Sequence, residues 1–231
     1  MTIGILILEN IWWDLNNANG NQASVLPFFK GLSRLNEDVQ VYYMTFTNAA
    51  GFNEALAHLL TAPQDRLLIY VASHGHGSNL GGAYFANIRN IIRNKLHMQN
   101  PRRVEGIIFG ACEIGNNDFA RLFQQTGLVW TLAYTKIVDW MSSTLIDLNF
   151  ASTMSKFNQD NLNSRPLIIS DAADDLRLFN PDENASWSQN AHNNKEGPDV
   201  SIRDIIRFMV KPRGQGNILI DNTQDLIKQT W

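Results

Sequence analysis

Two apolar segments of the chain each end at a residue that can do nucleophilic or acid–base chemistry. The first, residues 67–75, reads Leu-Leu-Ile-Tyr-Val-Ala-Ser-His-Gly and ends with His74 and Gly75. The second, residues 104–112, ends with Cys112, the single cysteine of the sequence. A thiolate attacks a carbonyl carbon readily when a nearby imidazole takes and returns protons. These residue types therefore indicate hydrolysis or acyl transfer through a thiol.

Glycines stand beside both of these residues. Gly75 follows His74, and Gly110 and Gly115 lie on either side of Cys112. A residue without a Cβ lets the backbone of a substrate approach closely, and its N–H group can meet a developing oxyanion. The glycines are therefore expected where a peptide carbonyl is held next to the nucleophile.

The two segments have the composition of buried parallel strands, and in open α/β sheets chemistry collects at the carboxyl ends of the strands. One helical segment, residues 86–96, separates them. A right-handed crossover through that helix makes the strands neighbours, which places His74 beside Cys112. A helix predicted over residues 118–126 follows the cysteine closely, so we expect its N-terminus to lower the pKa of the thiol.

Alternating strand and helix patterns cover the first two thirds of the chain. The apolar runs predict five strands, over residues 3–8, 39–46, 67–73, 104–112 and 128–134. Helical spacing of apolar residues predicts helices over residues 22–35, 53–60, 86–96, 118–126 and 140–157. Repeated β-α-β units imply an α/β fold with a mostly parallel central sheet that is covered on both faces.

The last third of the sequence is less regular. Residues 167–170 suggest a last central strand, residues 201–210 a helix and residues 217–220 a short edge strand. Between them, residues 171–198 are rich in Asp, Asn, Ser and Pro and predict a long loop. We therefore expect a single domain over residues 1–231, with its core in residues 3–170, the loop at 171–198, and a C-terminal helix and edge strand in 199–231.

Composition narrows the class of protein. The 231 residues carry a formal net charge of -3 with no basic stripe, so no nucleic-acid partner is expected. No apolar run reaches the roughly 20 residues of a membrane span, and residues 1–9 lack the features of a signal peptide. A lone Cys112 excludes an intrachain disulfide and a zinc site of several thiolates. These features predict a cytoplasmic protein without membrane contact.

The motifs resemble those of a known family. The order Ser-His-Gly after one apolar strand (residues 73–75), then Ala-Cys-x-x-Gly after a second (residues 111–115), is similar to the caspase-like (clan CD) cysteine peptidases. Residues 110–115, Gly-Ala-Cys-Glu-Ile-Gly, are most similar to the Ser-Ala-Cys-Glu-Thr-Gly of bacterial CHAT-domain proteases. The downstream order of helix, strand and acidic residue also follows CHAT-domain and separase-like proteases, and the resemblance covers residues 3–150. It implies a caspase-like three-layer α/β/α sandwich.

Carried onto this sequence, the resemblance assigns roles to individual residues. It makes Cys112 the nucleophile and His74 the general acid and base, with the backbone N–H groups of Gly75 and Cys112 as the oxyanion hole. Asp139 matches the acidic residue that lines the S1 pocket of separase, which implies cleavage after Arg or Lys. Glu9 lies where caspases place a residue of that pocket. From the residues alone, Asp139 could equally cap the helix that follows it.

The activity that the resemblance implies is that of a cysteine endopeptidase without a metal or other cofactor, acting on a protein or peptide. Such compact proteases suggest an effector of prokaryotic stress, cell-death or anti-phage defence, released by a partner protein or a small nucleotide signal. The chain lacks the long cleavable linker that follows the cysteine strand in caspases, so maturation by cutting there is not expected. The oligomeric state is not predicted.

Three alternatives stay open at the level of sequence. His76, two residues after His74, fits a Gly-His-Gly-Ser pattern that also occurs in the group, so it is the alternative catalytic histidine. The two histidines could instead form half of a metal site. The chain could also be a catalytically silent caspase-like module that signals or binds a ligand.

Overall fold

A seven-stranded sheet forms the middle layer of the computed structural model, which describes residues 2–11, 24–98, 103–182, 201–214 and 218–231. The strand order is β10-β9-β8-β7-β3-β1-β2, and β1, β2, β3, β7 and β8 are parallel while β9 and β10 are antiparallel. The strands are β1 (Ile3–Asn10), β2 (Val39–Phe46), β3 (Arg66–Ala72), β7 (Val104–Gly110), β8 (Trp130–Tyr134), β9 (Ile206–Val210) and β10 (Ile220–Asp221).

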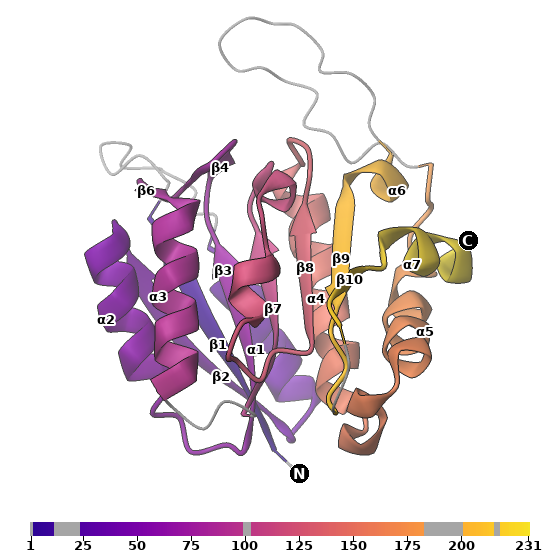
Figure 1. Ribbon diagram of the computed structural model, residues 1–231, viewed down its shortest axis with the longest axis horizontal. Helices are drawn as coiled ribbons and strands as arrows, with labels where there is room; N and C mark the ends of the chain where they lie inside the picture. The colour runs from indigo at the N-terminus through magenta and orange to yellow at the C-terminus, as the bar shows by residue number, and fades with distance from the viewer. Residues whose placement is uncertain (1, 12–23, 99–102, 183–200, 215–217) are drawn as a thin grey trace, which may run out of the picture.

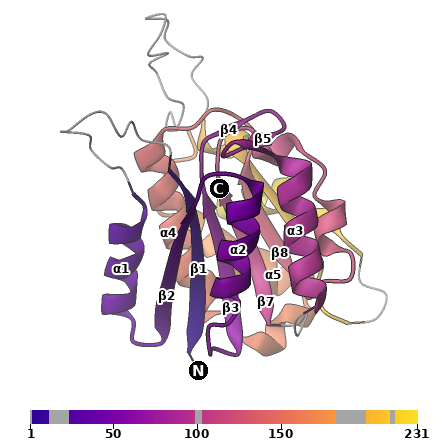
Figure 2. The same cartoon turned by 90° about the vertical axis from the view of Figure 1, so that its left-hand side faces the viewer.

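Helices cover both faces of the sheet (Figures 1 and 2). On one face lie α2 and α3, and on the other α1, α4 and α5, with α7 packed against α5 and β9. The helices are α1 (Leu26–Leu35), α2 (Ala49–Leu59), α3 (Phe85–Met98), α4 (Trp140–Lys156), α5 (Arg165–Leu176), α6 (Ile202–Ile205) and α7 (Thr223–Thr230). The predicted three-layer α/β/α arrangement around a mostly parallel sheet is confirmed.

The central strands are buried on both sides because their side chains alternate between two cores. In β1, Ile5 and Ile7 pack into the core beneath α1, α4 and α5, whereas Leu6 and Leu8 pack into the core beneath α2 and α3. All four are fully buried. A period of two with apolar residues at every position is what a strand between two helical layers requires.

The strands that end near His74 and Cys112 are direct neighbours, as predicted. β3 and β7 pair in parallel through the crossover helix α3, and Ala72 at the end of β3 lies opposite Gly110 at the end of β7. A smaller three-stranded sheet follows β3 at the same edge, made of β4 (Gly75–His76), β5 (Asn79–Leu80) and β6 (Ala83–Tyr84). It lies at the top of Figure 1, above the carboxyl ends of the parallel strands.

The strand predicted over residues 167–170 is wrong, because these residues belong to α5. Pro166 stands in the first turn of that helix, where its missing N–H costs nothing. The buried residues that follow recur with a helical period; they are Ile168, Ile169, Ala172, Ala173 and Leu176. A run of four apolar residues does not by itself distinguish a buried strand from a buried helix face.

The helix predicted over residues 201–210 is also wrong for most of its length. Only α6 is helical, and the chain then continues as β9, which pairs antiparallel with β8. Ile202, Ile205, Ile206 and Met209 have the spacing of a helix face and are all buried. The sheet position decides the conformation here, since β-branched and aromatic residues fit a pleated surface beside a buried strand.

The segment predicted as a helix over residues 118–126 forms no α-helix. A short 3₁₀ helix, η2 (Ala120–Phe123), takes its place, and another, η1 (Ile114–Asn116), precedes it. Phe119 packs against Phe85 and Phe109, with ring centroids 5.3 and 5.6 Å apart. The side chain of Asp118 accepts a hydrogen bond from the N–H of Ala120 at 2.9 Å. This local bond competes with α-helical bonding at the start of the segment.

The predicted loop at 171–198 begins later than expected, because α5 continues to Leu176. Residues 183–200 lie outside the described residues, as do residues 22–23 of the first predicted helix. The C-terminal helix is α7, which follows the edge strand β10 and was not predicted. Among the described helices, none combines the length and apolar character that crossing a membrane requires.

Candidate active site

A cavity of about 400 Å³ opens at the carboxyl ends of β3 and β7, next to the N-terminus of α4. Both His74 and Cys112 line it, together with Asp139. Its remaining lining is largely apolar or backbone; the residues are Val25, Tyr70, Ala72, Ser73, Gly75, Gly110, Ala111, Ile137, Val138, Trp140, Ser143 and Thr144. The topology therefore delivers the predicted nucleophile and the predicted base to one sheltered space.

The backbones that carry the two residues are in contact. The N–H of Ser73 donates to the carbonyl oxygen of Gly110 at 3.3 Å, which extends the pairing of β3 and β7. A Cβ on Gly75 would lie 2.0 Å from the carbonyl oxygen of Cys112 and 3.0 Å from its nitrogen. Only glycine fits at position 75, because any side chain would push the histidine segment away from the cysteine segment.

The thiol of Cys112 is partly buried and rests against the backbone of Val138. The N–H of Val138 donates to Sγ at 3.5 Å, and Sγ donates to the carbonyl oxygen of Val138 at 3.8 Å. Burial raises the pKa of the Cys112 thiol, the charge of Glu113 raises it further, and the Val138 N–H partly offsets both. The resting thiol is therefore protonated at neutral pH.

The predicted lowering of the Cys112 pKa is wrong. It assumed that an α-helix begins shortly after the cysteine, whereas η1 is a single 3₁₀ turn of three residues. So short a turn supplies little of the aligned dipole that lowers the pKa of a thiol at a helix N-terminus. Desolvation dominates instead.

His74 is partly buried in the same cavity. Burial lowers the pKa of its imidazole, since the cationic form loses solvation. At neutral pH the resting pair is therefore a neutral thiol and a neutral imidazole. A neutral imidazole can accept the proton of the thiol as the thiol attacks, which is the role of a general base.

His76 lies outside the cavity. Its side chain is 88% exposed, and Nδ1 is 3.1 Å from Oε2 of Glu113. The structure therefore separates the two candidate histidines by place: His74 faces the cavity that contains Cys112, and His76 contacts a carboxylate at the surface.

Asp139 caps α4 and also lines the cavity. Its Oδ2 accepts hydrogen bonds from the N–H of Ser142 at 2.8 Å and from the hydroxyl of Ser142 at 3.1 Å. Both bonds go to the same oxygen, and within the described part of the chain Oδ1 has no hydrogen-bond partner. The capping alternative is therefore correct, and it leaves one oxygen for a ligand in the cavity.

Glu9 has a different environment from the one the resemblance implied. Its side chain is fully buried and accepts hydrogen bonds from the Ser24 hydroxyl at 2.6 Å, the Val25 N–H at 2.9 Å and the Tyr43 hydroxyl at 2.8 Å. These bonds tie the end of β1 to the start of α1, and Glu9 is not part of the cavity lining. The carboxylate of Glu9 therefore stabilises the fold by joining these segments.

A second buried carboxylate, Asp147 of α4, lies beneath the cavity and was not singled out from the sequence. It is fully buried, and it accepts hydrogen bonds from the hydroxyls of Tyr134 at 2.7 Å and Tyr70 at 3.0 Å. Burial raises its pKa to about 7, and the two tyrosine bonds limit the rise. A Cβ on Gly110 would lie 2.7 Å from Oδ2 of Asp147. No sequence signal distinguished this residue from other polar positions of a helix.

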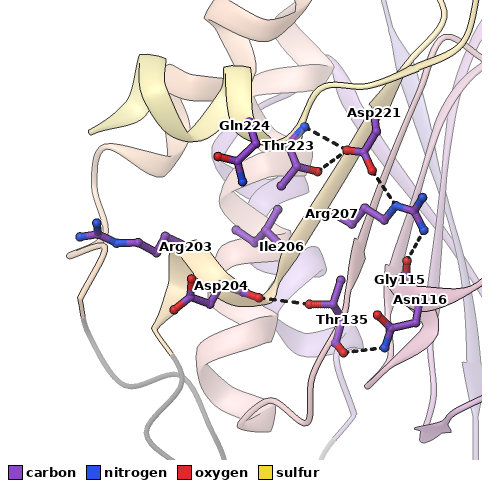
Figure 3. Close-up of a pocket in the computed structure, with 10 residues that line it drawn as sticks. All are labelled: Gly115, Asn116, Thr135, Arg203, Asp204, Ile206, Arg207, Asp221, Thr223 and Gln224. Atoms are coloured by element: carbon purple, nitrogen blue, oxygen red, sulfur yellow. Dashed lines mark hydrogen bonds and ion pairs between the residues drawn. The ribbon is translucent and has the colours of Figure 1, made fainter.

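A second cavity, of about 490 Å³, lies beside β9 and β10, next to the loop after Cys112 (Figure 3). Gly115 and Asn116 of that loop line it, together with Arg207 of β9 and Asp221 of β10. Arg207 donates to the carbonyl oxygen of Gly115 at 2.6 Å, and its Nε donates to Asp221 at 3.0 Å. This cavity contains the ion pair of Arg207 and Asp221 and the hydroxyl groups of Thr135 and Thr223.

The described residues contain no group of three or more His, Cys, Asp or Glu side chains placed to hold a metal ion. No family model matches the sequence, and no curated protein matches it. One similar solved structure is a secreted C11 cysteine protease from Bacteroides thetaiotaomicron in complex with an irreversible peptide inhibitor, with a TM-score of 0.48 and 9% identity. The match covers 91% of this chain and 66% of that one, so this chain spans just under two thirds of its length. Similarity of this extent carries no information on activity.

Proposed function

We propose that the chain is a caspase-like cysteine endopeptidase in which Cys112 is the nucleophile and His74 the general acid and base. The observation that carries the proposal is the delivery of both residues, from the ends of adjacent parallel strands, to one cavity. The carboxyl edge of a parallel sheet is where α/β enzymes place their chemistry. The apolar lining around the pair excludes water and strengthens the electrostatic interactions within it.

The reaction uses the neutral pair that the structure holds at rest. Sγ of Cys112 attacks the carbonyl carbon of the scissile peptide while the thiol proton passes to His74. The tetrahedral intermediate collapses, the C–N bond breaks, and the imidazolium gives its proton to the departing amine. Water, deprotonated by His74, then hydrolyses the thioester and regenerates the thiol. The side chain of Cys112 must leave the Val138 backbone before attack.

The N–H groups of Gly75 and Cys112 serve as the oxyanion hole in this proposal. The N–H of Gly81 donates to the carbonyl of His74 at 3.1 Å, and Gly75 pairs with Leu80 across the β4–β5 hairpin. Because hydrogen-bonded positions alternate in an antiparallel ladder, this pattern directs the N–H of Gly75 away from β5. The close contact between Gly75 and the Cys112 backbone supports a shared role for the two donors.

Specificity for Arg or Lys at P1 is assigned to Asp139. Its carboxylate lines the cavity that contains Cys112, and its Oδ1 is left over from helix capping within the described residues. A carboxylate at this position favours a cationic side chain through a charge-assisted hydrogen bond. Glu9 is left out of the proposed S1 pocket, because its carboxylate is bonded to Ser24, Val25 and Tyr43.

The protein acts, in this proposal, as a cytoplasmic effector of prokaryotic stress, cell-death or anti-phage defence, and it uses no cofactor. In this proposal a partner protein or a small nucleotide signal raises a basal activity, so the protein without its trigger already cleaves peptides slowly. The resting geometry supports external control, since the thiol of Cys112 is protonated and bonded to Val138. A trigger that moves residues 137–139 would free the thiol.

A catalytically silent caspase-like module is the second candidate. The same raised pKa of Cys112 and lowered pKa of His74 favour it, because neither residue is charged at rest. Such a module would keep the cavity for a ligand and show no turnover.

Hydrolysis of fluorogenic peptides with Arg, Lys, Asp or Leu at P1 separates the two candidates. The peptidase cleaves Arg and Lys peptides, loses all activity on Cys112→Ala substitution and is blocked by iodoacetamide but not by chelators. Absence of cleavage in the wild-type protein, or equal cleavage by the Cys112→Ala variant, would contradict the proposal.

A further inference from the structure

The loop after Cys112 holds the loop after His74 through two side-chain hydrogen bonds to Gly77. Oε2 of Glu113 accepts a hydrogen bond from the N–H of Gly77 at 2.8 Å, and Nδ2 of Asn117 donates to the carbonyl oxygen of Gly77 at 2.9 Å. Both backbone groups of one residue are thus held by two side chains from the cysteine loop. Gly77 has a φ of 55°, which a side chain would oppose.

Glu113 adopts an unusual backbone conformation to make this contact. Its φ is 61° and its ψ is -6°, in the left-handed region that residues other than glycine rarely adopt. The N–H of Glu113 donates to the carbonyl oxygen of Lys136 at 3.2 Å, which ties the residue to the segment after β8. Such a conformation persists only where several surrounding contacts hold it in place. Here those contacts join three loops around the cavity.

The other side of the same loop is fixed to β9. Nη1 of Arg207 donates to the carbonyl oxygens of Gly115 at 2.6 Å and Asn117 at 3.0 Å, and Asp221 holds its Nε (Figure 3). The guanidinium also lies 5.7 Å from the ring centroid of Phe119. Asn117 is therefore anchored through its carbonyl by Arg207 while its side chain holds Gly77.

From this geometry we infer that Glu113, Asn117 and Arg207 are positioning residues that set the distance between His74 and Cys112. Glu113 and Asn117 hold the histidine loop through Gly77, and Arg207 holds the cysteine loop against the sheet. The catalytic consequence of this inference rests on the proposed peptidase function, but the two hydrogen bonds to Gly77 do not depend on that function. Histidine and cysteine lie on separate strands, so the side chains that connect their loops determine how productively the two meet.

Three variants test the two side-chain hydrogen bonds to Gly77 separately. Glu113→Ala removes the acceptor for the Gly77 N–H, Asn117→Ala removes the donor to its carbonyl, and Glu113→Gln keeps an acceptor oxygen but removes the charge. Asp118→Asn is the matched control, because Asp118 lies in the same loop, contacts Arg89 and Ala120, and does not reach Gly77. All four variants are first compared with the wild type in thermal unfolding.

Amide hydrogen exchange reports on the hydrogen bonds to Gly77 and does not require catalysis. We expect the Gly77 amide to exchange at least about tenfold faster in Glu113→Ala, because its N–H loses its acceptor, and at the wild-type rate in Asp118→Asn. If the Gly77 amide exchanges at the wild-type rate in the Glu113→Ala variant, the hydrogen bond to Glu113 does not hold Gly77, whether or not the protein cleaves peptides.

Kinetics on the Arg peptide then report on positioning. We expect kcat to fall about 10- to 100-fold in Glu113→Ala and in Asn117→Ala with little change in KM. Glu113→Gln should lose less than Glu113→Ala, and the double variant should lose much less than the product of the two single losses, since both side chains hold one residue. Wild-type kcat in both alanine variants, or losses that follow the unfolding temperature alone, would overturn the positioning role. Absence of cleavage in the wild type would instead remove the proposed function and leave the exchange result standing.

Discussion

The cavity that contains Cys112 and the cavity beside β9 differ in the contacts that their polar groups make. In the cavity beside α4, His74 and Cys112 lie among largely apolar side chains, and the thiol makes long, weak contacts with the Val138 backbone. In the cavity beside β9, Arg207 and Asp221 form an ion pair, and Arg207 also bonds two carbonyl groups of the loop. One side holds groups that can react, and the other holds groups that keep the loop in place.

This difference indicates that the two cavities meet different requirements. A reactive thiol must be able to give up its proton, so strong fixed partners would oppose its chemistry. A loop that carries a nucleophile must be rigid. We therefore expect it to be held by side chains that each make several short, charge-assisted hydrogen bonds. In this chain the first cavity includes Cys112, and the second includes Gly115 and Asn116, a few residues further along the same segment.

The largest effect should come from removing the base in the first cavity. His74→Ala should lower kcat/KM on Arg peptides about 10²–10⁴-fold, because the imidazole of His74 is the proposed general base for the Cys112 thiol. His76→Ala is the matched control and should stay within about threefold of the wild type, since His76 contacts Glu113 outside the cavity. Equal losses in the two variants, measured with the same peptides, would contradict the assignment.

Removing the anchor of the second cavity should have a smaller effect. Arg207→Met should destabilise the protein by about 1.5–3 kcal/mol, the typical worth of a hydrogen bond to a charged group, and lower kcat about tenfold. Arg203→Met provides the control, because Arg203 lines the same cavity but pairs with Asp182 and does not contact the cysteine loop. If both variants unfold at the same denaturant concentration as the wild type, Arg207 is not an anchor.

The substitution Asp139→Asn tests the charge at the edge of the first cavity. Asparagine caps helices about as well as aspartate, so α4 should persist while the negative charge is lost. We expect kcat/KM to fall about 10- to 100-fold for Arg and Lys peptides and to stay unchanged for Leu peptides, as measured by competition within one peptide library. An unaltered P1 profile would refute the role of Asp139 in specificity.

The buried carboxylate of Asp147 should affect stability rather than catalysis. Burial raises the pKa of Asp147 to about 7 from its ordinary value of 3.8, so the folded state retains a proton that the unfolded state loses in this interval. Stability contributed by this group should therefore fall as the pH rises from about 4 to about 7 and stay level above it, by a few kcal/mol in total. Asp147→Asn should lose this component, which urea unfolding at pH 5 and pH 8 would reveal. Parallel pH dependence of the two proteins would show that Asp147 does not titrate as described.

The sequence predicted the central strands and the proximity of His74 and Cys112 better than it predicted the C-terminal third of the fold. Strands β1, β3 and β7 are continuous apolar runs, and the crossover rule placed His74 beside Cys112 without any contact information. Residues 167–170 and 201–210 failed because short apolar segments fit both a helix face and a strand, and only packing against β8, α4 and α7 decides between them.

The electrostatics of the site could not be predicted in the same way. The pKa of Cys112 depends on how deeply the thiol is buried and on the absence of an α-helix directly after it, and neither is visible in the spacing of residues. The roles of Glu113, Asn117 and Arg207 depend on contacts across 36 to 92 positions of the chain. Such contacts follow from the tertiary fold alone.

The most direct test of the central claim is covalent labelling of the purified protein with an Arg acyloxymethyl ketone, beside Leu and Asp probes, with the modified residue located by mass spectrometry. A working pair of Cys112 and His74 with a negatively charged S1 pocket predicts selective modification of Cys112 by the Arg probe, reduced in the Asp139→Asn variant and absent in Cys112→Ala. Failure of all three probes to modify Cys112, or labelling that persists in Cys112→Ala, would contradict the claim that this cavity is a peptidase active site.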